Sequence, residues 1–243
     1  MRRAKTIKYA AAAVFLALCL LLCGCASIGE LLSAMNAEET ESAAPVNKTE
    51  AAPTAAADNA GINPVFSLYS EFTAAYRAAS EGMLDAVASL GSAEAASLYT
   101  ELLCCEAALV RALWAVGMLP QSETGGGFSG SVTGTENGEG RLHTNGDFTF
   151  AFESGEELSG SYPDGGVFTC TSSGAERVRL KLAKRGGGFR MSVVIGRNAF
   201  AAEISKDGIR CADTPLSFDI ENDAFPEDAL TLTYSDAGAQ IAE

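Results

Sequence analysis

Histidine and basic residues are scarce in this chain of 243 residues. His143 is the single histidine, and 17 Lys and Arg stand against 31 Asp and Glu, which gives a net charge of −14. Most of such a surface repels a polyanion, so the composition argues against a nucleic-acid-binding protein. Because no cysteine or second histidine lies near His143 in the sequence, we expect it to be a lone exposed side chain rather than part of a metal site.

Common catalytic motifs are also lacking. The chain contains no G-x-S-x-G and no S-x-x-K motif. Residues 125–130 match G-x-G-x-x-G by letter, but a strand pattern follows them instead of a helix, which excludes the dinucleotide-binding interpretation. Asp219, Glu221 and Asp223 imitate the start of a calcium loop that lacks its glycine and its closing glutamate. We therefore predict a non-enzyme with no cofactor and no metal; only Asp and Glu gathered in a deep cleft would favour a hydrolase.

The N-terminus has the three parts of a secretion signal: a cationic start, an apolar run over residues 9–22, and small residues. Its end, Leu22-Cys23-Gly24-Cys25, resembles the lipobox of bacterial lipoproteins. The resemblance implies that the Cys25 thiol carries diacylglycerol and that a signal peptidase cuts between Gly24 and Cys25. Two or more acyl chains, such as palmitate, would then anchor the protein on the extracytoplasmic face of a bacterial membrane.

Two other interpretations of this segment remain open. One is an uncleaved membrane helix, since no charge falls between Lys8 and Glu30, although the strongly apolar part is shorter than the roughly 20 residues that a span requires. The other is a plain secreted protein, for which no A-x-A site closes the apolar run. Cleavage before Cys25 removes four basic and no acidic residues, which leaves a net charge of −18.

The rest of the chain divides into three segments. Residues 25–63 are rich in Ala, Glu, Thr, Ser and Pro and predict a disordered tether behind the lipid site. Residues 64–120 predict a helical hairpin: Asn63 and Pro64 start a helix that runs to Leu90, and Gly91 and Ser92 separate it from a second helix. Apolar residues recur at steps of three and four in both helices, as one buried stripe requires.

Residues 125–243 predict an antiparallel β meander packed with the helical hairpin in one folded unit. Short alternating runs are separated by glycine-rich turns throughout this segment. The candidate strands cover 128–133, 141–144, 148–153, 158–162, 167–171, 177–183, 189–195, 199–205, 209–212, 216–220 and 230–234. The predicted fold class is α+β, with a curved sheet or open barrel. Its layout resembles the general shape of periplasmic lipoprotein-carrier proteins, although the hairpin that precedes the sheet departs from their usual order and no functional residue is carried over.

Two groups of residues are candidates for sites in the β segment. Cys170 and Cys211 lie in separate strands, where an exported protein permits either a disulfide or two buried free thiols. Basic residues alternate with apolar ones and continue around the next turn, which predicts a stripe for an anionic ligand or, alternatively, a solvated face paired with neighbouring acids. The stripe comprises Arg177, Arg179, Lys181, Lys184, Arg185 and Arg190.

These patterns favour a non-catalytic, envelope-anchored lipoprotein whose β-rich module binds an apolar or anionic ligand. Its partners would be the membrane, through the lipid anchor, and a lipid, an envelope polymer or an envelope protein. The alternative is a structural or interaction subunit of a cell-envelope complex that has no small ligand.

Overall fold

The fold is that of a computed structural model, which describes residues 61–242 except 124–125, 135, 175–176 and 228. The signal peptide, the lipid site at Cys25 and nearly all of the tether lie outside the described residues. The described part has three helices and an eleven-stranded antiparallel sheet, and Gly61–Glu243 forms a compact unit with its own core.

The helices start and stop where their capping residues predict, with one exception. α3 (Pro64–Ser80) begins at Asn63, whose side-chain oxygen accepts a hydrogen bond from the Val65 amide at 3.0 Å. The sequence predicted one helix as far as Leu90, but the structure has a break before α4 (Met83–Leu90). α3 ends at Ser80 because its C-cap, Glu81, is extended with ψ 118°, and Gly82, with φ +82°, forms the N-cap of α4. α5 (Ala93–Gly117) follows the predicted Gly91-Ser92 turn.

The sheet is a meander in which each strand pairs antiparallel with the next along the chain. It is open, because among the described residues β1 pairs in the sheet only with β2, and β11 only with β10. One predicted strand was wrong, because residues 216–220 lie outside the strands, and one strand, Gly238–Ala242, was not predicted. The strands are β1 (Phe128–Val132), β2 (Gly138–Leu142), β3 (Asp147–Phe152), β4 (Glu157–Ser161), β5 (Phe168–Ser172), β6 (Val178–Arg185), β7 (Gly188–Ile195), β8 (Asn198–Ser205), β9 (Gly208–Thr214), β10 (Thr231–Ser235) and β11 (Gly238–Ala242).

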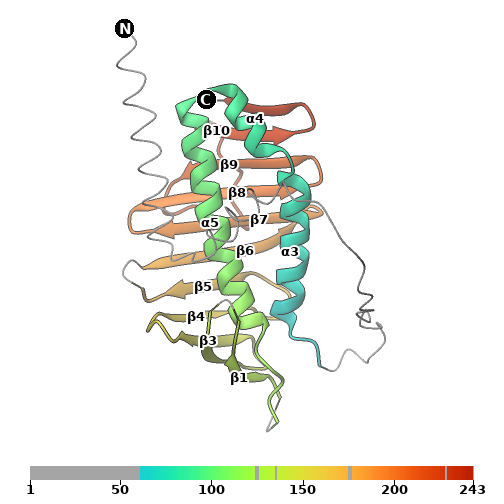
Figure 1. The fold of residues 1–243 in the computed structure, drawn as a ribbon, viewed down its shortest axis with the longest axis vertical. Coiled ribbons are helices and arrows are strands. Elements are labelled where there is room, and N and C mark those ends of the chain that lie inside the picture. The colour runs from blue at the N-terminus through green and yellow to red at the C-terminus, as the bar shows by residue number, and fades with distance from the viewer. Residues whose placement is uncertain (1–60, 124–125, 135, 175–176, 228, 243) are drawn as a thin grey trace, which may run out of the picture. The chain divides into compact units, whose positions relative to one another are not determined.

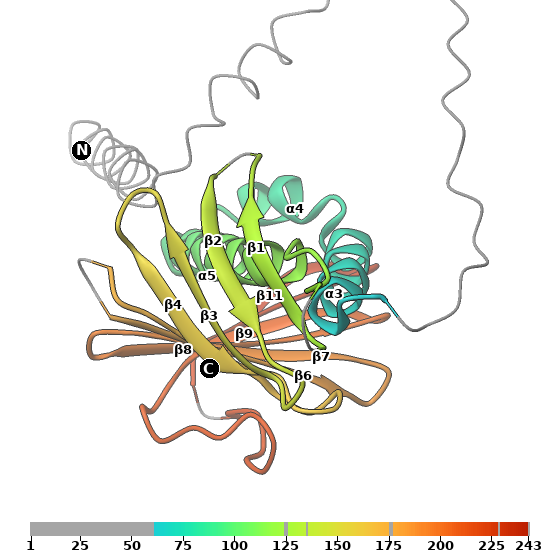
Figure 2. The ribbon, with the colours of Figure 1, turned by 90° about the horizontal axis from the view of Figure 1, so that it is seen from below.

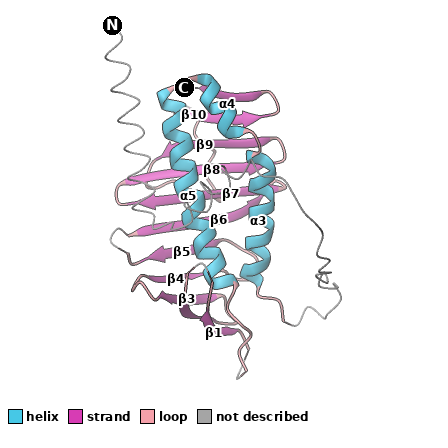
Figure 3. Cartoon of the chain, in the orientation of Figure 1, coloured by secondary structure: helices cyan, strands magenta, loops and turns pink. Residues whose placement is uncertain are grey.

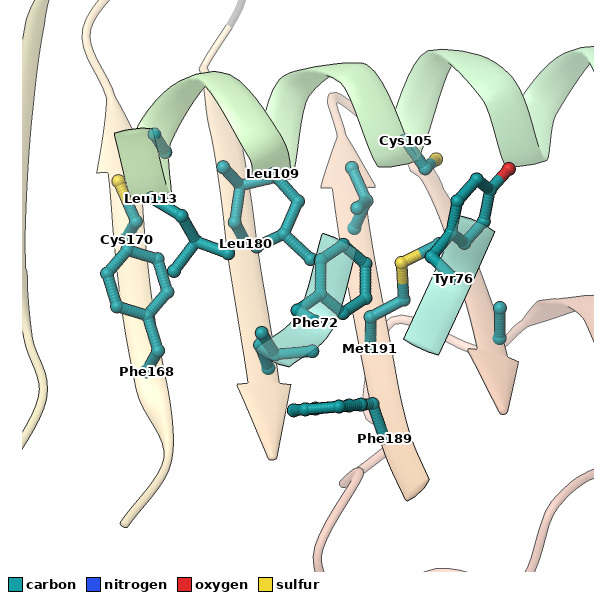
Figure 4. Close-up of a cluster of buried hydrophobic side chains, with 14 of the residues drawn as sticks. Phe72, Tyr76, Cys105, Leu109, Leu113, Phe168, Cys170, Leu180, Phe189 and Met191 are labelled. Carbon is teal, nitrogen blue, oxygen red and sulfur yellow. The ribbon is translucent and has the colours of Figure 1, made fainter. Parts of the chain in front are cut away.

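The helices all lie on one face of the sheet, here named the inner face. α3 and α5 pack against each other and cross the strands, with α4 beside β11 (Figures 1 and 3). The view from below shows the sheet curling around this helical layer (Figure 2). Aromatic and aliphatic side chains from the helices and from the sheet pack together between the two layers (Figure 4). The rings of Phe72 and Phe189 meet edge to face, with their centroids 5.5 Å apart. Helix side chains therefore occupy the concave side of the sheet.

Glycines of β2 and β4 leave space for three phenylalanines of β3 on the inner face. Phe148, Phe150 and Phe152 of β3 alternate with exposed residues, as predicted, and all three are buried. Each has a glycine as a cross-strand partner: Phe148 faces Gly160, Phe150 faces Gly140, and Phe152 faces Gly138. A Cβ added at any of these glycines would overlap backbone or ring atoms. The aromatic cluster thus depends on the glycines of β2 and β4.

An ion-pair network ties α5 to two sheet loops. The Arg111 guanidinium donates to Glu136 and to Glu156, each at 2.6 Å, and lies 3.8 Å from the centroid of the Phe152 ring. Glu136 precedes β2, and Glu156 lies in the β3–β4 turn. One side chain therefore holds the helix over both loops.

We expect Arg111→Met to lower the free energy of unfolding by about 1–2 kcal/mol, since it removes two charge-assisted hydrogen bonds and a cation–π contact at a partly exposed site. Urea titration of the unit 61–243 measures the effect. Arg77→Met is the matched control, because Arg77 is exposed on α3 and its loss is expected to cost under about 0.5 kcal/mol. Equal losses in the two variants would contradict this role for Arg111.

Candidate functional site

The structure divides the predicted basic stripe among three environments. Lys184 lies on the helix side of the sheet and pairs with Glu71 of α3 at 2.6 Å. Arg185 and Arg190 lie on the opposite face, here named the outer face, and donate to backbone carbonyls. The prediction of one continuous stripe was therefore wrong. Side chains alternate between faces along a strand, and a loop covers part of the outer face.

That covering loop spans residues 215–230, and two arginines hold it. Arg190 is 5% exposed and donates to the Ile220 carbonyl at 3.2 Å, to the Asp223 carbonyl at 2.7 Å and to the Glu203 carboxylate. Arg185 donates to the Ile220 carbonyl at 3.2 Å and to the next carbonyl along the loop at 2.6 Å. Phe225 packs beneath the loop in a second, small apolar cluster. Both arginines therefore have structural partners.

The remaining three residues of the stripe are exposed on β6 or just before it. Lys181 is close enough to Asp219 for its charge to help lower the pKa of that carboxyl, after hydrogen bonds from Asn222 and from the Glu221 backbone. Arg177 and Arg179 have no ion-pair partner among the residues that the structure describes. These two arginines are the part of the stripe that is left for a ligand.

A cleft of about 570 Å³ lies beside these arginines on the outer face of β2–β5. It is named here the β2–β5 cleft. Five of its twelve lining residues are Ser or Thr, and two carboxylates and one guanidinium also line it. The lining residues are Glu139, Thr149, Phe150, Ala151, Glu157, Leu158, Ser159, Thr171, Ser172, Ser173, Gly174 and Arg177. The lining therefore offers neutral hydroxyls, which donate and accept hydrogen bonds, a cationic donor and two anionic acceptors.

Strand register arranges this chemistry in rows across the sheet. One row places Thr149, Ser159 and Thr171 side by side, with Arg141 at one end and Arg179 at the other. A second row places two carboxylates, Glu139 and Glu157, on either side of Ala151. A row of hydroxyls flanked by guanidinium groups can hydrogen-bond to hydroxyls and phosphates of a long ligand. Sequence reasoning missed the cleft because its lining comes from four strands whose register the sequence does not reveal.

Of the two alternatives for Cys170 and Cys211, the structure confirms the free thiols: no disulfide joins them, and both are buried. Cys170 lies on β5 and Cys211 on β9, so three strands separate them. Four interstrand steps amount to about 19 Å, which no disulfide spans. Burial raises the pKa of each thiol to about 12, so both stay protonated at neutral pH.

A group of perturbed acids lies between α5 and β9, apart from the cleft. The pKa of Glu101 is raised to about 7 by burial and by the neighbouring Asp213, with which it shares a hydrogen bond. Burial alone raises the pKa of Glu106 to about 7. Tyr76 completes the group: its hydroxyl is buried and has no hydrogen-bond partner among the described residues, and burial, then Glu106, raise its pKa. Sequence reasoning gave no signal for these residues, because helix and strand meet only in the fold.

The remaining sequence motifs lie outside the β2–β5 cleft. His143 is exposed as predicted, and lines a polar depression of about 330 Å³ with Arg141 and Ser129. The calcium-like segment forms a turn in which the Asp219 amide donates to the Asp223 carboxylate at 2.8 Å. Among the residues described, no three His, Cys, Asp or Glu side chains are placed to hold a metal. The helices of that part are each too short or too polar to cross a membrane.

Comparison with known proteins found no matching family model, no similar curated protein and no similar solved structure.

Proposed function

We propose that this chain is a lipid-anchored envelope protein that binds an anionic, hydroxyl-rich polymer in the β2–β5 cleft. The lipobox-like Leu22–Cys25 supports the anchor and the extracytoplasmic location. The observation that carries the binding proposal is the pair Arg177 and Arg179, exposed beside a cleft lined by hydroxyls. In a chain with this excess of acids, two arginines that have no ion-pair partner among the described residues and lie next to this cleft favour an anionic ligand.

The chemistry of the cleft favours a chain of phosphates and polyols. Guanidinium groups bind phosphate oxygens with two parallel hydrogen bonds. Hydroxyls of Thr149, Ser159 and Thr171 both donate to and accept from the hydroxyls of a polyol, while Glu139 and Glu157 accept from them. Side chains of α3 and α5 fill the concave side of the sheet, which argues against an apolar ligand there. We therefore favour the anionic ligand over the apolar one.

Binding of poly(glycerol phosphate) to the unit 61–243, followed by calorimetry at low salt, tests this proposal. We expect saturable binding that weakens as salt is raised, because the attraction at exposed arginines is screened. The double variant Arg177→Gln, Arg179→Gln should bind at least about tenfold more weakly, since it loses two charge-assisted contacts.

The matched control is the double variant Arg77→Gln, Lys206→Gln, which removes the same charge at exposed positions on α3 and in the turn between β8 and β9. Its affinity should equal that of the parent protein. An equal loss in both variants would mean that only net charge matters. No binding by the parent protein would contradict the polymer ligand and favour an interaction subunit of an envelope complex.

A further inference from the structure

One end of the helical layer is apolar, exposed and uncharged. The start of α3 and the end of α5 meet there, because the Asn63 side-chain amide donates to the Val116 carbonyl at 2.8 Å. The backbone of Phe66 lies against Gly117, where an added Cβ would be 3.0 Å from the Phe66 Cα. Ile62, Phe66 and Met118 are exposed at this end, by 55%, 40% and 43%. These three side chains are named here the apolar tip.

Charge is absent from both segments that form the apolar tip. Neither residues 61–70 nor residues 112–122 contain Asp, Glu, Lys or Arg, although such residues make up 20% of the chain. Along the chain, the first charges that flank these two segments are Asp58 and Glu71 for the first and Arg111 and Glu123 for the second. The opposite end of the helical layer differs: the exposed Leu84 and Leu90 of α4 stand among Glu81, Asp85 and Glu94. An uncharged apolar surface can approach an anionic membrane, whereas an acidic one is repelled.

The apolar tip is also where the chain enters the described unit. Gly61 leads directly to Ile62, and 35 residues lie between Gly61 and the expected lipid site at Cys25. Figure 1 shows the start of α3 at one end of the helical layer and α4 at the other. Of the two ends, the apolar tip is therefore nearer to the anchor along the chain. This connection and the lack of charge together indicate a lipid bilayer as the occupant.

We propose that the apolar tip docks on the outer leaflet of the membrane that holds the lipid anchor. The proposal rests on the anchored location stated above. Ile62, Phe66 and Met118 would enter the boundary between headgroups and acyl chains, as exposed apolar side chains of peripheral proteins do. Docking at this end would bring the β1–β4 end of the sheet nearest to the membrane (Figure 1), with the β2–β5 cleft on the face of the sheet opposite the helical layer.

Tryptophan quenching tests the docking directly. The lipid-modified full chain is reconstituted in vesicles of phosphatidylethanolamine and phosphatidylglycerol, with and without brominated acyl chains. Ile62→Trp and Phe66→Trp place a reporter on the tip, and Leu84→Trp places the control reporter at the other end of the helical layer. The parent chain, whose single tryptophan is Trp114, gives the background. We expect brominated lipid to quench at least half of the added fluorescence at positions 62 and 66, and under a tenth at position 84.

The outcomes separate the docking from the anchor. A chain that floats with vesicles but shows no quenching at positions 62 and 66 overturns the apolar tip alone. Equal quenching at positions 62 and 84 also overturns it, since the unit would then have no preferred orientation. A concentration-dependent blue shift without quenching means that a second copy covers the tip, and contradicts docking. A parent chain that does not float overturns both the anchor and the docking.

Discussion

Replacing Arg190 with methionine is expected to lower the free energy of unfolding by about 3 kcal/mol. Arg190 is buried, and its guanidinium holds the Glu203 carboxylate and two carbonyls of the covering loop. Loss of one member of a buried ion pair typically costs about 3–5 kcal/mol. The low end applies here because Glu203 keeps a second partner, Arg210, at 3.4 Å.

Two measurements check the Arg190 prediction. In a unit of this size, the loss corresponds to a fall in Tm of roughly 6–12 °C. Limited proteolysis should also cut the variant within residues 215–230 sooner than the parent protein, because the loop loses two of its carbonyl contacts. Arg197→Met, at an exposed turn, is the control and should change neither readout. A loss under about 1 kcal/mol for Arg190→Met would show that Arg185 alone holds the loop.

The same arginine shows why the basic stripe could not be predicted correctly. Alternation along β6 and β7 correctly places Arg179 and Arg190 on the face opposite the apolar residues. It gives no information on a loop that returns 30 residues later to supply the Ile220 carbonyl. The loop itself was taken for a strand because 216–220 alternates, yet no neighbouring strand remains beside it in the sheet. Both errors arose because the structure here depends on contacts between segments that lie far apart in the sequence.

Local signals were more dependable where a single residue type fixes the backbone. Asn63 with Pro64, and Ser92 after Gly91, define helix starts through hydrogen bonds that act within three residues. Asn145-Gly146 likewise marks the turn into β3, where Gly146 has φ +89°. The break within the predicted helix had no such signal, because only the structure shows that the extended Glu81 ends α3 and that Gly82 adopts a left-handed conformation before α4. Local signals could not predict the β2–β5 cleft, because its rows of side chains depend on the register between four strands.

Glu106→Gln is expected to stabilise the protein at alkaline pH and to have little effect in acid. Burial between α5 and its neighbours raises the pKa of Glu106 from 4.5 to about 7, and Tyr76 and Tyr99 lie close enough to respond to its charge. Between pH 4.5 and about pH 7, the Glu106 carboxyl has lost its proton in the unfolded chain but keeps it in the folded chain. Stability therefore falls as pH rises from about 4.5 through 7, and the loss is complete above that range.

The size of the effect follows from the two pKa values. Their difference corresponds to at most about 3 kcal/mol, and partial exposure of the side chain reduces this to about 2 kcal/mol. Urea titrations of the unit 61–243 should show Glu106→Gln more stable than the parent protein by that amount at pH 8.5, with the two curves converging near pH 4. Glu139→Gln, at an exposed carboxylate of β2, is the control and should leave the pH dependence unchanged. A stabilisation of equal size at pH 4 and pH 8.5 would mean that Gln packs better than Glu at this position, and that ionisation of Glu106 costs the fold nothing.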